Sequence, residues 1–211
     1  MIYSALTTPQ IIYIVVVAVI VILAILIILL FPVRKYQIKK NYVRYYHKMI
    51  YKIAVYNDYY LINNFTFKVD FATNMTVQHL LFGDKYVYLI MDFYYDGDIA
   101  GKAFDKSLII MDHKGTRKYI DNPILVCKNA LTKLSMATGM QPSIVIGIAL
   151  LNDNCHSNIV SDSNQFYAIS RNKLPALVKA IESRQIGNLN AESLGKMVQS
   201  INRMNKRKKK K

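Results

Sequence analysis

Two segments of the chain bring together side chains that could act as nucleophiles, bases or metal ligands. In the first, LNDNCHSNIVSDSN at residues 151–164, a cysteine and a histidine stand among serines and aspartates: Cys155, His156, Ser161, Ser163, Asp153 and Asp162. A serine or cysteine nucleophile needs a base within hydrogen-bond reach, and adjacent residues rarely face each other in that way. The chain also contains no GxSxG nucleophile elbow. The composition therefore predicts a polar surface loop instead of a hydrolase centre.

The second segment, residues 77–102, places aspartates among apolar residues in VQHLLFGDKYVYLIMDFYYDGDIAGK. Carboxylate oxygens suit hard divalent cations such as Mg²⁺. Asp92 stands inside an apolar run, whereas Asp96 and Asp98 flank a glycine in a pattern typical of a turn. Every acid between residues 45 and 170 is an aspartate, and the glutamates lie further on, at Glu182 and Glu192. The segment therefore offers few carboxylates for a metal site.

The other metal-ligating residue types are scattered along the chain. No CxxC pair occurs, and the histidines lack the spacing of zinc ligands: His47, His79, His113 and His156. The sequence therefore predicts no metal site and no cofactor. Cys127 and Cys155 are expected to be reduced, as small buried hydrophobic residues.

The elements that must hold these residues begin with an apolar helix. The first 33 residues carry no charged side chain, and Ile11 to Phe31 is an unbroken run of 21 apolar residues. At about 1.5 Å per residue, such a helix spans roughly 30 Å of hydrocarbon. A secretory signal would show a basic n-region, a shorter apolar run and a small-residue cleavage site. The run therefore predicts a retained transmembrane helix.

The charge of the chain is concentrated in two clusters. Lys and Arg number 28 against 13 Asp and Glu, a formal charge of +15. One cluster follows the apolar run directly: Arg34, Lys35, Lys39, Lys40 and Arg44. The other ends the chain: Arg203, Lys206, Arg207, Lys208, Lys209, Lys210 and Lys211. The positive-inside rule then predicts a single-pass protein of the cell membrane, with its N-terminus outside and its C-terminal domain in the cytoplasm.

Residue patterns after the apolar run predict one α/β domain. Apolar spacing predicts helices at residues 37–56, 122–139, 174–183 and 191–204. Aromatic and β-branched runs predict strands at residues 59–67, 77–82, 86–94, 107–111, 143–151 and 166–170. This order predicts an α/β sandwich with a mixed sheet, in which an antiparallel meander precedes a helix and a buried central strand, and two helices end the chain.

The segment at residues 77–102, followed by Asn122-Pro123 opening a helix, resembles the NERD (nuclease-related) domain of the restriction-endonuclease-like superfamily. The matching positions are Val77, His79, Leu80 and Leu81 in one strand, 87–90 in the next, Gly97, Ile99 and Gly101 in a loop, and Asn122-Pro123. The similarity covers roughly residues 42 to 150. It implies a restriction-endonuclease-like α/β sandwich and, because the family also carries a histidine at His79, a polar network around that residue.

The catalytic positions of that superfamily are replaced in this chain. An Asp, a Glu and a Lys hold a divalent cation and orient water there, and the resemblance aligns these positions with Gln78, Met91 and Phe93. An amide, a thioether and a phenyl ring cannot hold Mg²⁺. Asp92 adjoins the glutamate position, but strand alternation places it on the opposite face from Met91 and Phe93. The departures predict a nuclease-like scaffold without nuclease activity.

The expected organisation is a short extracytoplasmic end at residues 1–10, a transmembrane helix at 11–31, a basic juxtamembrane segment at 32–44, a nuclease-like domain at 45–170, C-terminal helices at 171–204 and a polybasic tail at 205–211. We expect a catalytically inactive module in the bilayer whose tail binds nucleic acid, anionic lipid headgroups or a protein partner. The tail contains no aromatic residue for base stacking. A solvated tail that binds no ligand is an alternative interpretation. The alternatives are a residual metal-dependent nuclease using Asp92 with Lys102 or Lys114, and a structural component of a membrane assembly.

Overall fold

The structure is a computed structural model that describes residues 8–69, 73–112, 114–160 and 163–208. The chain divides into two compact units, Met1–Tyr42 and Val43–Lys211. The first unit contains helix α1, Thr8–Lys40. Within it, Ile12–Leu30 is long and apolar enough to cross a membrane, a property that a signal sequence near an N-terminus would share.

The second unit alternates helices and strands. In chain order they are α2 (Tyr42–Tyr56), β1 (Tyr60–Lys68), β2 (Asn74–Phe82), β3 (Val87–Asp92), β4 (Asp98–Lys102), β5 (Ser107–Met111), β6 (Arg117–Asp121), α3 (Pro123–Thr138), the 3₁₀ turn η1 (Pro142–Ile144), β7 (Val145–Leu151), β8 (Ser157–Val160), β9 (Phe166–Ser170), the 3₁₀ turn η2 (Arg171–Lys173), α4 (Leu174–Glu182) and α5 (Ala191–Lys208).

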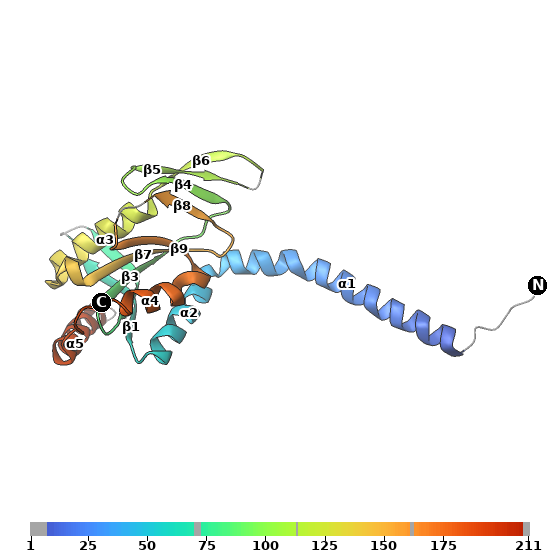
Figure 1. Cartoon of the computed structure of the whole chain (residues 1–211), viewed down its shortest axis with the longest axis horizontal. Coiled ribbons are helices and arrows are strands. Elements are labelled where there is room, and N and C mark those ends of the chain that lie inside the picture. The colour runs from blue at the N-terminus through green and yellow to red at the C-terminus, as the bar shows by residue number, and fades with distance from the viewer. Residues whose placement is uncertain (1–7, 70–72, 113, 161–162, 209–211) are drawn as a thin grey trace, which may run out of the picture. The chain divides into compact units, whose positions relative to one another are not determined.

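Two sheets organise this unit, as Figure 1 shows. The first has the order β1-β2-β3-β7-β9, with β1, β2 and β3 antiparallel and with β7 parallel to both β3 and β9. The second has the order β6-β5-β4-β8. The predicted α/β fold with a mixed sheet and two C-terminal helices is therefore confirmed. The second sheet was not predicted as such: β5 is a predicted strand, whereas β4 and β8 lie in segments predicted as loops, and no element is predicted at β6.

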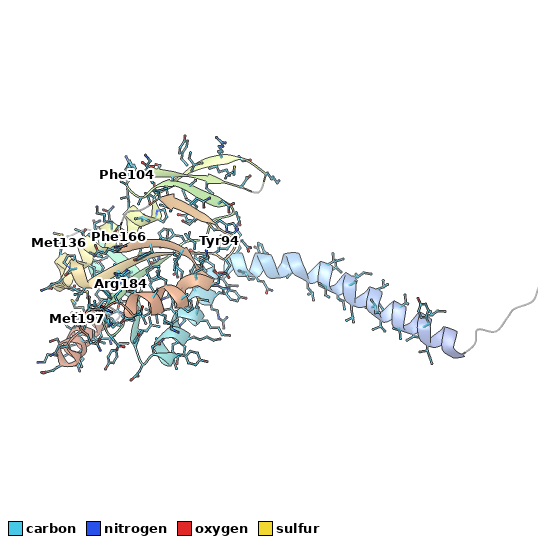
Figure 2. The ribbon with its side chains drawn as sticks, viewed as in Figure 1. Tyr94, Phe104, Met136, Phe166, Arg184 and Met197 are labelled. Carbon is cyan, nitrogen blue, oxygen red and sulfur yellow. The ribbon has the colours of Figure 1, made fainter. Side chains whose placement is uncertain are left out.

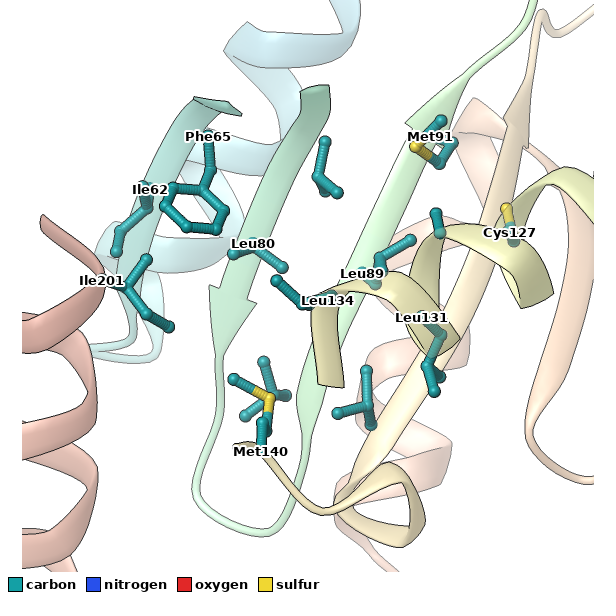
Figure 3. Packing of buried hydrophobic residues seen from close by; sticks show 14 of the residues in the cluster. Ile62, Phe65, Leu80, Leu89, Met91, Cys127, Leu131, Leu134, Met140 and Ile201 are labelled. Atoms are coloured by element: carbon teal, nitrogen blue, oxygen red, sulfur yellow. The ribbon is translucent and has the colours of Figure 1, made fainter. Parts of the chain in front are cut away.

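The central strand β3 is covered on both faces. Its alternate residues Val87, Leu89 and Met91 belong to one core cluster with residues of α3 and α5, namely Cys127, Leu131, Leu134, Val198 and Ile201 (Figure 3). The intervening residues point to the other face, because side chains alternate along a strand. There, Tyr88 donates a hydrogen bond to Glu182 of α4. The last residue of that face is Asp92.

The alternation of side chains along β1 is interrupted at one residue, Asn64. Asn64 adopts the left-handed conformation with φ 52°, and the paired positions of β1 and β2 skip Asn64. As a result Ile62 and Phe65, three residues apart, lie in the same core cluster, although simple alternation would separate them. The register of the two strands places Asn63 directly opposite His79. These two polar residues are thereby brought together across the strand pair.

Helix α3 is fixed at both ends by predicted signals. The side chain of Asn122 accepts a hydrogen bond from the Ile124 N–H, with Pro123 in the first turn. Gly139 ends the helix in the left-handed conformation, with φ 72°. The predicted helix start at Asn122-Pro123 is confirmed. Two other boundaries differ from the prediction, since α1 runs to Lys40 before the interruption at Asn41, and α5 continues to Lys208 into the segment expected to be a tail.

Candidate functional site

The positions that align with nuclease catalytic residues lie in apolar surroundings. Met91 is buried in the core cluster that β3 forms with α3 (Figure 3). Phe93 packs against the same cluster. Gln78 is half-buried, and its Oε1 atom is enclosed without a hydrogen-bond partner among the described residues. The expected shared face of Met91 and Phe93 is confirmed. A thioether and a phenyl ring at these positions give the α3 side of the sheet apolar packing and supply no oxygen ligand.

Asp92 lies on the other face in a buried polar network. Its Oδ2 atom is 3.0 Å from Nε2 of His79, and Nδ1 of His79 is 2.6 Å from Oδ1 of Asn63. Both ring nitrogens of His79 thus face oxygen atoms of neighbouring side chains. The ring of His47 in α2 stacks on the His79 ring at a centroid distance of 5.9 Å. The network therefore joins β1, β2, β3 and α2, as the resemblance implied for His79.

This network cannot meet a substrate in the described conformation. The side chains of His79 and Asp92 are 2% and 0% exposed. An acid-base pair must reach the atom whose proton it transfers, within about 3 Å or through one water. The second carboxylate oxygen, Asp92 Oδ1, is also buried with no hydrogen-bond partner among the described residues. The pair is a buried hydrogen bond within the core. Because both side chains are buried, loss of either one would leave the other without a partner for that bond.

Neighbouring carboxylates form bonds to the backbone. Asp98, the first residue of β4, accepts a hydrogen bond from the His156 N–H, and Asp105, in the turn after β4, accepts one from the Lys102 N–H. Lys102 lies in β4 with its ammonium 5.5 Å from the centre of the Phe104 ring, which Figure 2 labels at the second sheet. Among the described residues, no three His, Cys, Asp or Glu side chains form a group able to hold a metal ion. No described contact links Asp92 to the lysines suggested as its catalytic partners.

The segment at residues 151–164 is part strand and part loop. Asp153 forms an ion pair with Arg171 and accepts a hydrogen bond from the Asn172 N–H. Cys155 is buried, and burial, assisted by the charge of Asp98, raises the pKa of its thiol to about 12. A thiol with so high a pKa is a poor nucleophile at neutral pH. Ser161, Asp162 and His113 lie outside the described residues.

The cysteines match their predicted role. Cys127 is a residue of α3 that packs into the core, and burial raises the pKa of its thiol far above the ordinary value. With Cys155 also buried, both thiols behave as small core residues. The expectation of a uniformly polar loop was only partly right, since Cys155 is in the core and Ser157–Val160 forms β8.

Four residues of the basic cluster at the end of the chain, Arg203, Lys206, Arg207 and Lys208, lie in helix α5. In α5, Lys196 forms an ion pair with Glu192 one turn earlier at 2.5 Å, and Arg203 is exposed. A hollow of about 340 Å³ on this helix is lined by Lys196, Gln199, Ser200, Arg203 and Met204. The backbone of Lys206, Arg207 and Lys208 continues α5, whereas their side chains and all of Lys209, Lys210 and Lys211 lie outside the described residues.

The juxtamembrane cluster is only partly described. Lys39 and Lys40 have exposed side chains in the last turn of α1. The side chains of Arg34 and Lys35 lie outside the described residues, although their backbone belongs to α1. Cations in the last turn suit the negative end of the helix dipole.

A half-buried carboxylate on α4 was not predicted. The Oε1 atom of Glu182 accepts a hydrogen bond from the Tyr88 hydroxyl at 2.6 Å, and its Oε2 atom accepts one from the Lys85 N–H at 3.0 Å. Burial raises the pKa of the Glu182 carboxyl, against the effect of those two bonds. Burial, with the nearby charges of Glu182 and Asp84, raises the pKa of Tyr59 to about 12. Only the rarity of glutamate in this sequence distinguished Glu182 beforehand.

Comparison with known proteins adds little to this geometry. No family model matches the chain, and no curated protein matches it. A solved structure titled "Crystal Structure of Protein of Unknown Function AF1548" is similar over 74% of this chain and 78% of that chain, with 9% sequence identity and a TM-score of 0.36. At that score the similarity carries no argument about fold or function.

Proposed function

We propose that this protein is a membrane-anchored, non-catalytic module with a NERD-like domain, whose basic C-terminal helix binds phosphate polyanions at the cytoplasmic face of the membrane. The observation that carries the proposal is the continuation of α5 through Lys208, which makes the first part of the polybasic end helical. A helix keeps its cations at fixed spacing. It can therefore follow a row of phosphates with less loss of conformational entropy than a coil.

The α5 surface offers the donors that phosphates accept. Lys196, Gln199, Ser200 and Arg203 line one hollow, and they supply ammonium, amide, hydroxyl and guanidinium donors. Such contacts are sequence-independent, because they address the phosphate and not the base. The ligand class is therefore a phosphate-rich polymer or surface: nucleic acid or anionic lipid headgroups.

The absence of a catalytic role in the proposal rests on the strand positions. Met91 and Phe93 pack into the apolar core, while Asp92 is held by His79 on the opposite face. Hydrolysis of a phosphodiester by metal-bound water requires a carboxylate ligand at an accessible face. The nuclease-like relationship itself comes from the sequence resemblance.

The membrane location in the proposal rests on α1 and its flanking charges. Only 11 residues lie between Leu30, at the end of the apolar stretch, and Tyr42, where α2 begins. Even a fully extended segment of that length reaches about 40 Å. A retained anchor would therefore keep the domain and its basic helix close to the phosphates of the bilayer or of nucleic acid near it.

The test compares the full chain in neutral phosphatidylcholine nanodiscs with a variant in which Lys206, Arg207 and Lys208, the helical part of the polybasic end, are replaced by glutamine. Labelled DNA and RNA, and vesicles containing phosphatidylglycerol, serve as probes at low and at moderate salt. We expect the full chain to bind a probe with steep salt dependence, and the variant to bind it at least about tenfold more weakly at low salt. A Lys114→Gln, Arg117→Gln, Lys118→Gln variant is the matched control, because these basic residues are exposed in the second sheet.

Three outcomes contradict the proposal. Equal binding by the tail variant and the control variant would show that net charge alone attracts the probe. Failure of the full chain to hold any probe at low salt would leave the end of the chain as a solvated tail. Cleavage of DNA stimulated by Mg²⁺ or Mn²⁺, and lost in Asp92→Ala, would support the residual nuclease instead. Crosslinking to one constant protein in membranes would support the structural assembly role.

A further inference from the structure

Helix α2 presents an unpartnered face that combines cations with aromatic residues. One side of α2 is buried against the sheet, through Tyr46, Ile50, Ile53 and Ala54. The opposite side is exposed and carries residues at helical spacing: Arg44, Lys48, Tyr51, Lys52 and Val55. We call this set the α2 face. It is part of the folded domain, because the buried side of the same helix fixes it to the core.

The composition of the α2 face is that of a helix at a membrane surface. Three of its five residues are basic, and the whole helix Tyr42–Tyr56 contains no acid. Tyr51 is 56% exposed and Val55 is 60% exposed. Large apolar and aromatic side chains are costly to leave in water, and tyrosine ring and lysine stem suit the boundary between headgroups and acyl chains. The basic residues of the α2 face therefore complement anionic lipid headgroups, and its Tyr51 and Val55 suit the boundary with the acyl chains.

A hollow beside the α2 face has the same mixed character. Its volume is about 590 Å³, and its lining includes Lys52 and Tyr56 from α2 and Pro175, Val178 and Lys179 from α4. Lys52 and Lys179 are exposed and of the same sign, whereas Tyr56 is 83% exposed. Glu182, the acid of this hollow, is half-buried and accepts bonds from Tyr88 and Lys85. The hollow thus extends the region where a phosphate and the start of an acyl chain find complementary groups.

We infer that the α2 face, Arg44, Lys48, Tyr51, Lys52 and Val55, lies on the anionic lipid surface and fixes the orientation of the domain on the bilayer. Chain continuity favours the bilayer as the occupant, because only Asn41 separates α2 from the helix that contains the apolar stretch. The inference goes beyond the proposed function. It concerns a different helix and rests on the membrane anchor of the proposed function, but not on what α5 binds.

The chain supplies a clean probe for this inference because it contains no tryptophan. Tyr51→Trp places one indole on the α2 face. Tyr119→Trp places one on β6 of the second sheet, where the tyrosine is 80% exposed, and serves as the matched control. Each full-length variant is reconstituted in nanodiscs of phosphatidylcholine alone and of phosphatidylcholine with phosphatidylglycerol, with and without dibrominated phosphatidylcholine. Bromine quenches indole emission only at close range, so it reports contact with lipid.

We expect a blue shift and several-fold bromine quenching of Trp emission in Tyr51→Trp with anionic discs, and neither in Tyr119→Trp. Adding Arg44→Glu, Lys48→Glu and Lys52→Glu to the Tyr51→Trp chain should abolish the quenching. Far-UV circular dichroism and thermal unfolding check that this variant is folded. A second variant, Lys48→Gln with Lys52→Gln, should lower the quenching without reversing charge.

Equal quenching of the two tryptophans, or equal quenching in neutral and anionic discs, would overturn the inference. A blue shift of Tyr51→Trp without bromine quenching would overturn it as well, since it would place the face against protein and not lipid. Removal of residues 204–211 separates this inference from the proposed function. Quenching that survives the removal supports the α2 face, whereas quenching that disappears shows that the end of the chain alone holds the domain on lipid.

Discussion

At the scale of single residues, the chain places its chemically capable groups where they support the core. Asp92 and His79 would form an acid-base pair at a surface, yet here both side chains are almost fully buried, and Asn63 fills the remaining side of the ring. Removal of one partner from a buried polar pair leaves the other without a hydrogen bond, at a cost of about 1–3 kcal/mol. The pair is therefore expected to be strongly coupled in stability.

A double-mutant cycle tests that coupling. His79→Leu and Asp92→Leu should each lower the free energy of unfolding by about 2–3 kcal/mol, because each orphans a buried polar atom. The double variant should be less destabilised than the sum by about 1–3 kcal/mol. Denaturant unfolding of the detergent-solubilised chain, followed by circular dichroism, gives the four values. Thr66 and Thr76, an exposed hydroxyl pair 2.8 Å apart on the same two strands, provide the control cycle with little coupling expected, using Val in both positions. Additive His79 and Asp92 effects would contradict a buried hydrogen bond between the two.

Glu182 gives a residue-scale prediction about pH. Burial raises the pKa of its carboxyl above the ordinary 4.5, so between those two values the folded chain holds a proton that the unfolded chain releases. The contribution of this group to stability is then fully present below pH 4.5 and declines as pH rises through the raised pKa. Glu182→Gln removes the titration, and its amide can still accept from the Lys85 N–H and donate to the Tyr88 oxygen.

The melting temperature of Glu182→Gln relative to the unaltered chain should therefore increase from pH 4 to pH 7, as measured by thermal unfolding at matched ionic strength. Glu192→Gln is the matched control, since this carboxylate is exposed in α5 and pairs with Lys196. A difference that stays constant with pH would show that burial of Glu182 does not affect its titration.

At the scale of elements, the sequence predicts those helices and strands whose burial or capping produces a recognisable residue pattern. Strand β7, VIGIALL, is buried at every position and reads as an unbroken apolar run. Helix α3 has a cap at each end, Asn122 and Gly139. Strands β6 and β8 escaped prediction because one face of each stays exposed, and their residues include Lys, Asp, Ser and Asn.

Of the network around His79 and Asp92, the sequence predicted only what side-chain alternation along β3 determines. Alternation along β3 places Met91 and Phe93 on one face and Asp92 on the other. The partners Asn63 and His47 depend on strand register and on helix packing, which link residues 16 and 32 positions from His79 in the sequence. Local patterns do not encode such contacts. The resemblance to a nuclease-related domain indicated a polar role for His79 but not its partners.

Asn122 supports a prediction at the level of elements. Its Oδ1 atom caps α3, while its Nδ2 atom donates to three carbonyl oxygens of the chain before β5, those of Lys102, Ala103 and Asp105. Asn122→Ala should lower the free energy of unfolding by about 3 kcal/mol, because a cap and buried acceptors are lost together. Asn122→Asp should cost at least as much, since a carboxylate has no N–H for those carbonyls.

The control for this prediction is Asn190→Asp at the start of α5. There the side chain accepts from the Ser193 N–H, and aspartate caps a helix about as well as asparagine. Thermal unfolding of the four proteins decides the matter. If Asn122→Asp unfolds like the unaltered chain, Asn122 is an ordinary cap and does not join the β4–β5 connection to α3.

At the scale of the whole molecule, charge is distributed along the chain more than within the domain. The apolar stretch Ile12–Leu30 is followed by one basic cluster, and the chain ends with another. The α2 face, which shares Arg44 with the first cluster, extends that cluster into the folded unit. The proposed function and the inference about the α2 face both require a retained α1 anchor. The combined effect of the basic residues then depends on which side of the membrane the domain occupies.

Topology is therefore the prediction on which the rest of the proposal depends, and the buried cysteines make it measurable. Because Cys127 and Cys155 are each about 1% exposed, the unaltered chain should react little with a membrane-impermeant maleimide. Ser4→Cys should be labelled in intact cells, and Lys179→Cys only after the membrane is opened, since the basic cluster after the apolar run favours the cytoplasmic side. Replacing Arg34, Lys35, Lys39 and Lys40 by glutamate should weaken that preference and yield a mixed population. Labelling of Lys179→Cys in intact cells would contradict the predicted topology, because it would place the domain outside. Cleavage of the chain after the apolar stretch would identify that stretch as a signal sequence.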